Sequence, residues 1–164
     1  MAAGATYTPI ASYTVTSAQS SYTFSSINGS YTDLVLIENI QFSASANQSV
    51  MSFGDSSTLY SSTNLQGNGT SALSARFTSG SGVGSSPGAG SGTDWINVIR
   101  HIQNYSNTTT YKTFLQRSNW AGGQVFATVG LWRNTAAIST IVLATTGGNY
   151  AVGSTFSLYG ITAA

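Results

Sequence analysis

The chain has 164 residues, of which 41% are hydrophobic, 12% are aromatic and only 5% carry a formal charge. Ordinary soluble domains place roughly a quarter of their residues in Asp, Glu, Lys and Arg, so hydroxyl and amide groups provide most of the polar surface here, with 27 Ser, 22 Thr and 11 Asn. A net charge of +1 without a basic run excludes an electrostatic surface for phosphates, and we expect no nucleic-acid partner.

The composition does not indicate a metal site, a reactive thiol or a membrane-spanning helix. The chain has no Cys and one His, which excludes disulfides and Cys-ligated zinc and leaves no ligand set, so we expect no metal and no cofactor. The longest strongly apolar run, Leu34–Ile37, ends at Glu38, far short of the roughly 18 residues of a membrane helix. Residues 1–9 lack the charged start and apolar core of a signal peptide, and we interpret them as an N-terminal arm.

In chain order, short runs of β-branched and aromatic residues alternate with polar ones, which is typical of strands rather than helices. Turn-forming pairs such as Asn28-Gly29 and Gly122-Gly123 separate the runs. We predict ten strands and no helix. They cover residues 10–16, 20–27, 31–43, 49–54, 72–78, 94–105, 110–119, 124–133, 138–145 and 153–161.

These strands predict an all-β, single-domain antiparallel β-sandwich of jelly-roll kind over residues 10–164. A Gly/Ser-rich stretch at 79–92 holds one apolar side chain larger than Ala besides Pro87. Because neither side of this stretch is long enough for an independent core, we predict a flexible loop within one domain.

One acidic residue breaks the alternation. Glu38 is in register with Leu34, Leu36 and Ile40, which turns it toward the apolar face of its strand. Either a bulge rotates Glu38 outward, or it is buried against one of the arginines in the predicted strands, Arg100, Arg117 or Arg133, because a buried charge needs a partner. We favour the outward orientation.

The search for catalytic residues returns weak candidates. Gly84-Ser85-Ser86-Pro87-Gly88 matches the nucleophile-elbow pattern, but the motif requires a strand before it and a helix after it, and here it lies in a Gly/Ser loop. A Ser-His-Asp arrangement would have to use His101, with Asp94 or Asp55 as its orienting carboxylate. The four carboxylates, Asp33, Glu38, Asp55 and Asp94, form no cluster that suggests a glycosidase pair. We therefore predict no catalytic residue and no enzyme.

The tryptophans are the remaining candidates for a binding surface, because aromatic side chains anchor both sugars and protein interfaces. We assign Trp95 and Trp132 to the sandwich core. Trp120 precedes Ala121-Gly122-Gly123, which places it near a loop.

Four segments in one order resemble a widespread group of tailed-phage virion proteins, known from phages of cyanobacteria and other marine bacteria. The resemblance covers most of the chain, from about Ile10 to Ile161. The segments are Tyr31-Thr32-Asp33-Leu34-Val35-Leu36, Gln103-Asn104-Tyr105-Ser106-Asn107-Thr108-Thr109-Thr110-Tyr111-Lys112-Thr113, Leu131-Trp132-Arg133-Asn134-Thr135-Ala136-Ala137-Ile138 and Gly153-Ser154-Thr155-Phe156-Ser157-Leu158-Tyr159-Gly160-Ile161.

The resemblance implies a jelly-roll-like sandwich that assembles on a virus particle, either as a capsid decoration (cement) protein or as a tail or fibre component. A single compact sandwich favours the capsid surface, and we expect a homotrimer bound to the major capsid protein. The alternative is a tail-associated carbohydrate-binding module that uses Trp120 and nearby tyrosines to bind a host-surface glycan.

Overall fold

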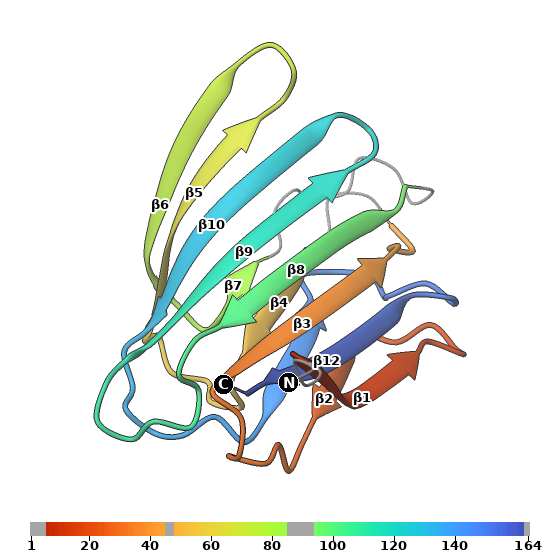
Figure 1. Ribbon diagram of the computed structural model, residues 1–164. Helices are drawn as coiled ribbons and strands as arrows, with labels where there is room; N and C mark the ends of the chain where they lie inside the picture. Colours follow the sequence, from red (N-terminus) through yellow and green to blue (C-terminus); the bar gives the residue numbers. More distant parts are fainter. Residues whose placement is uncertain (1–5, 45–47, 85–93, 163–164) are drawn as a thin grey trace.

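The computed structural model describes residues 6–44, 48–84 and 94–162, and within these ranges it contains strands and no helix. The all-β sandwich predicted from the sequence is confirmed (Figure 1). Its strands are β1 (Tyr7–Thr14), β2 (Ser21–Phe24), β3 (Asp33–Ile40), β4 (Ser49–Ser52), β5 (Tyr60–Gly67), β6 (Ala72–Gly80), β7 (Val83–Gly84), β8 (Ile96–Ile102), β9 (Lys112–Trp120), β10 (Gln124–Trp132), β11 (Ile141–Thr145) and β12 (Thr155–Ile161).

Two antiparallel sheets make up the sandwich. The large sheet has the order β1-β12-β3-β8-β9-β10-β5-β6, and the small sheet has the order β2-β11-β4-β7. The first four strands of the large sheet, β1-β12-β3-β8, and the four of the small sheet, β2-β11-β4-β7, have the strand order of an eight-stranded jelly roll. The hairpins β9–β10 and β5–β6 are additions to this plan, and we call these four strands of the large sheet the extension.

The core lies between the two sheets because alternate residues of each strand point inward. Leu36, Val98 and Phe114 of the large sheet are fully buried, as are Met51 and Leu143 of the small sheet. Aromatic rings close one end of this core. They are Tyr13, Tyr22 and Phe156, which stack with centroids 4.1 to 6.4 Å apart.

The described residues form twelve strands where the sequence predicted ten, and most predicted strands are longer than the observed ones. Strand β1 begins at Tyr7 and pairs with β12, so residues 7–9, which we had assigned to the arm, belong to the sheet. Strand β5 was missed because its inward positions carry polar residues such as Ser62 and Asn64, which removes the apolar alternation. The predicted loop at 79–92 contains the end of β6 and all of β7, and its residues 85–92 lie outside the described residues.

The extension reaches beyond the small sheet, and the β5–β6 hairpin lies at the far edge of the large sheet (Figure 1). Every residue of β6 from Ala72 to Ser79 is exposed. Large apolar side chains are exposed there as well: Leu73 and Phe77 are 54% and 56% accessible to solvent. The jelly-roll strands bury most of their apolar residues, with Tyr7 and Ile37 exposed, whereas the extension leaves several large ones uncovered.

Candidate functional site

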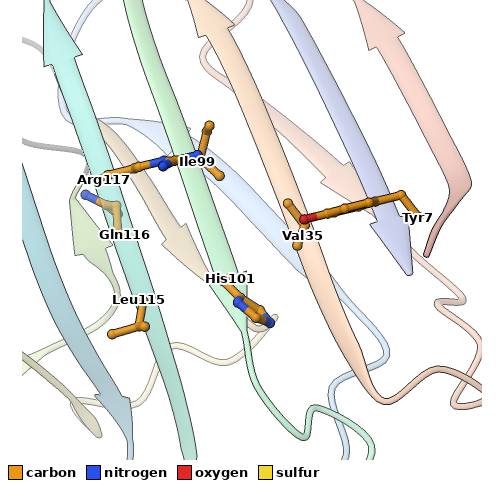
Figure 2. Close-up of a pocket in the computed structure, with 7 residues that line it drawn as sticks. All are labelled: Tyr7, Val35, Ile99, His101, Leu115, Gln116 and Arg117. Carbon is orange, nitrogen blue, oxygen red and sulfur yellow. The ribbon is translucent and has the colours of Figure 1, made fainter. Parts of the chain in front are cut away.

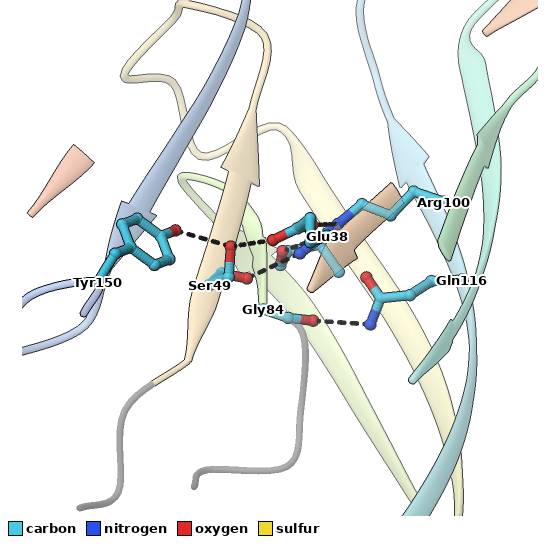
Figure 3. A network of polar contacts seen from close by, with 7 residues as sticks. Glu38, Ser49, Gly84, Arg100, Gln116 and Tyr150 are labelled. Atoms are coloured by element: carbon cyan, nitrogen blue, oxygen red, sulfur yellow. Dashed lines mark hydrogen bonds and ion pairs between the residues drawn. The ribbon is translucent and has the colours of Figure 1, made fainter. Parts of the chain in front are cut away.

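Glu38 is fully buried, so our prediction that it points outward was wrong. One of its carboxylate oxygens accepts a hydrogen bond from Arg100 Nε at 2.7 Å, and Arg100 is also fully buried (Figure 3). The rest of the guanidinium donates to the carbonyls of Val83 at 3.0 Å and Ser49 at 2.8 Å. No bulge interrupts the pairing of β3 with β8, so period two holds and Glu38 points between the sheets.

Two hydroxyls complete this network. Ser49 Oγ donates to the second oxygen of Glu38, and it lies 2.7 Å from the hydroxyl of Tyr150 (Figure 3). Burial, together with the nearby charge of Glu38, raises the pKa of Tyr150, so its phenol stays neutral at physiological pH. Because all four side chains are inaccessible to solvent, the network ties β3 and β8 to β4 and is structural.

His101 lies on the opposite, outer face of the large sheet, in a shallow hollow of about 300 Å³ (Figure 2). Its Nε2 is 2.8 Å from Asp33 Oδ2, so its carboxylate partner is Asp33 rather than Asp94 or Asp55. The hollow is also lined by Tyr7, Val35 and Arg117, but not by a serine that His101 could activate. The serines of the nucleophile-elbow pattern, Ser85 and Ser86, lie outside the described residues.

Asp94 and Trp120 are paired with each other. Trp120 is the last residue of β9 and half-buried, and its indole N–H donates to Asp94 Oδ2 at 2.7 Å. The ring also packs closely over the backbone of Gly122, where a Cβ atom would lie 2.3 Å from it. Trp120 is therefore partly covered, whereas Trp95 is 39% exposed and our assignment of Trp95 to the core was wrong.

Trp132 is buried, as predicted, and belongs to a cluster around Asp55. Asp55 accepts hydrogen bonds from Trp132 Nε1 at 3.0 Å, Tyr60 Oη at 2.7 Å and Ser57 Oγ at 2.6 Å. Burial by itself raises the pKa of Asp55, but these hydrogen bonds outweigh it and hold the pKa below its ordinary value. The cluster fixes the loop before β5 against the core.

We expect Asp55→Asn to destabilise the protein at neutral pH by about 1.5–3 kcal/mol, the range for hydrogen bonds to a charged group. Because the folded pKa lies below the ordinary value of 3.8, the carboxylate stabilises the fold above about pH 4, and that contribution is lost as pH falls through the folded pKa. Urea unfolding measured from pH 2 to pH 7 should therefore show that the difference in free energy of unfolding between the wild type and Asp55→Asn becomes smaller in acid. The matched variant Ser57→Ala removes one donor and should give a smaller loss; a gap that does not change with pH would contradict this assignment.

Four exposed apolar side chains share the outer face of the extension. They are Leu65, Leu115, Val125 and Val129, which are 48% to 61% exposed and which we call the outer patch. Leu115 and Val129 stand directly opposite each other on β9 and β10, and Leu65 on β5 is opposite Ala127. Sequence alternation alone assigned one face of β10 to the core; it did not show that the other face is also apolar and uncovered.

Ligand-binding chemistry is sparse among the described residues. They contain no group of three His, Cys, Asp or Glu side chains that could hold a metal ion. Over residues 6–44, 48–84 and 94–162 there is also no helix of the length and hydropathy needed to cross a bilayer. The features that stand out are thus exposed apolar surfaces and not a reactive cluster.

Comparisons with known proteins give only weak structural similarity. No protein-family model matches the sequence, and no curated protein matches it. Among solved structures, the crystal structure of exo-inulinase from Aspergillus awamori is similar with a TM-score of 0.40 and 12% sequence identity. The match covers 94% of this chain but 29% of that chain. A similarity this low carries no argument about the activity of this chain.

Proposed function

We propose that this chain is a structural protein of a tailed-phage virion, a decoration protein that binds the major capsid protein and stabilises the head. The observation that carries the proposal is the outer patch, which presents four large apolar side chains on one face of the extension. Exposed apolar patches of this kind mark protein–protein contacts.

The charge distribution supports attachment by packing and hydrogen bonds. Three of the nine formal charges, Glu38, Arg100 and Lys112, are buried, and Asp33, Asp55 and Asp94 accept hydrogen bonds within the chain. On the same face as the outer patch the exposed charges are Arg117 of β9 and Arg76 of β6, whose β5 partner Thr63 is opposite Val129. Because the surface carries so little charge, we expect its affinity for a partner protein to depend only weakly on salt concentration.

The family resemblance and the single compact sandwich support a homotrimer on the capsid surface. Sedimentation with heads built from the cognate major capsid protein tests binding, and light scattering tests the trimer. We expect retention on heads that persists in high salt. Val129→Glu should abolish retention by placing a charge in the outer patch, while Val152→Glu, at an equally exposed valine outside the extension, should leave it unchanged. Equal retention of both variants, or release of the wild type by moderate salt, would contradict the proposal.

A tail-associated carbohydrate-binding module is the alternative implied by the sequence. Its proposed platform, Trp120, has its N–H engaged by Asp94 and one ring face covered at Gly122, which leaves less of the ring for stacking on a sugar. Glycan-array binding by the wild type, lost in Trp120→Ala and retained in Val129→Glu, would favour the alternative over the capsid role.

A further inference from the structure

The four edge strands of the two sheets differ in how they are protected against pairing with another chain. Strand β1 carries Pro9, which has no N–H, and a register shift between Pro9 and Ala11; β2 has four residues and β7 has two. Prolines, bulges and short length are the usual protections of a sheet edge. Strand β6 has nine residues, no proline and one charge, Arg76, and among the described strands only β5 pairs with it. Its pairing with β5 also has a register shift, but this lies after Phe77, so residues 72–77 form an uninterrupted edge.

The side chains of β6 are self-complementary about Ala75. If a second β6 lies antiparallel with Ala75 opposite its own copy, Leu73 stands opposite Phe77 and Ser74 stands opposite Arg76. Moving the centre by one residue to Arg76 would place two guanidinium groups directly opposite each other, which is unfavourable, and would leave Leu73 opposite Ser79. One register therefore pairs the apolar residues and separates the charges.

The face that Leu73 and Phe77 share is also open. Their β5 partners are Gln66 and Ser62, on the inward side of the large sheet, and here a hollow of about 250 Å³ is lined by Leu73, Phe77 and Phe126, among others. Both side chains are more than half exposed. Two copies paired through β6 would bring two leucines and two phenylalanines together over this hollow.

We propose that β6 is a self-association edge, at which two copies of the chain pair antiparallel about a two-fold axis through Ala75 and join their large sheets into one. The occupant is a second copy because the apolar residues Leu73 and Phe77 of β6 meet each other's copies when the strand is paired with its own reverse, and Arg76 then meets Ser74 and no second arginine. The contact is isologous, uses a different surface from the outer patch, and can join two single chains or two trimers alike.

A disulfide trap tests the register directly, because the wild type has no cysteine. Residues opposite each other in antiparallel strands have Cα atoms about 4.5–5.5 Å apart, which is within the range of a disulfide. Ala75→Cys should therefore form a disulfide-linked dimer under mild oxidation, whereas Ser74→Cys, opposite Arg76 of the second copy, should not. A mixture of Ser74→Cys and Arg76→Cys chains should form the mixed dimer. If Ala75→Cys crosslinks no faster than Ser74→Cys, the proposal is overturned.

A pair of substitutions that introduces opposite charges tests whether the contacts between Leu73 and Phe77 hold the two edges together. Leu73→Lys should halve the mass measured by light scattering, because it places an ammonium group opposite Phe77 of the second copy. Adding Phe77→Glu should restore the mass by creating two ion pairs across the axis, while head binding through the outer patch stays intact. An unchanged mass in Leu73→Lys would overturn the pairing, and failure of the double variant to recover would overturn this register. Both sites are exposed, so the variants remain folded, which circular dichroism checks.

Discussion

Replacing Glu38 with Gln is expected to lower the free energy of unfolding by about 3–5 kcal/mol, because it leaves the buried Arg100 guanidinium without a counter-charge. Ion pairs cost a large desolvation energy when they are buried, and that cost remains after one partner has been neutralised. Urea unfolding at pH 7 measures the change. A loss of this size is a large part of the roughly 5–15 kcal/mol that stabilises an ordinary domain.

Two further variants test whether the stability loss comes from burial of the ion pair and not from the loss of an ion pair alone. Asp33→Asn removes the partly exposed carboxylate beside His101 and should cost about 0–1 kcal/mol, as surface pairs do. The double variant Glu38→Leu/Arg100→Met removes both charges and should recover part of the lost stability. The recovery is partial because the Ser49 hydroxyl loses its acceptor and the Val83 carbonyl loses its donor. If Glu38→Gln unfolds within 1 kcal/mol of the wild type, the buried network does not exist.

The sequence predicted the sandwich because its buried strands alternate. In the run 94–105, for example, Ile96 and Val98 alternate with Asn97, both apolar side chains are buried, and strand β8 lies within the predicted range. Strand β5 could not be predicted in this way, because Ser62 and Asn64 occupy its inward positions and are shielded by neighbouring chain. Propensity and periodicity detect apolar burial, and burial of polar groups by tertiary contacts leaves no periodic signal.

Glu38 was misjudged for a related reason. Its position in the period-two pattern indicated burial, but the partner that makes burial tolerable, Arg100, is 62 residues away in the chain. From the sequence, Arg100, Arg117 and Arg133 were equal candidates for the partner, because the choice among them depends on the pairing of β3 with β8. The surfaces proposed for binding could not be predicted from the sequence either, because the exposure of Leu73 and Val129 depends on the tertiary arrangement of the strands.

The scarcity of charge is greater at the surface than in the sequence. Besides Glu38 and Arg100, Lys112 is fully buried, and its ammonium donates to the carbonyls of Thr110 and Thr135 at 2.9 and 3.1 Å. Burial lowers the pKa of Lys112 accordingly. Three of the few charged side chains therefore form hydrogen bonds in the interior, and the exposed surface consists mainly of hydroxyl and apolar groups.

A single methyl group at Gly130 is expected to destabilise the fold by about 1–3 kcal/mol, as overpacking of a core does. Gly130 on β10 is opposite Phe114 on β9, and the ring lies over the glycine so closely that a Cβ atom there would be 2.0 Å from it. The ring cannot move away freely, since Phe114 is fully buried and packs edge-on against Phe53 with a centroid distance of 6.1 Å. Thermal or urea unfolding of Gly130→Ala measures the loss.

Gly160→Ala is the matched control for this variant. A Cβ atom at Gly160 would lie 2.3 Å from the ring of Tyr31, but Tyr31 is only half-buried and can rotate toward solvent, so the loss should be smaller. Combining Gly130→Ala with Phe114→Leu should cost less than the sum of the two single variants, because the smaller side chain frees the space that the methyl group needs. Additive losses would show that the ring of Phe114 does not rest on Gly130.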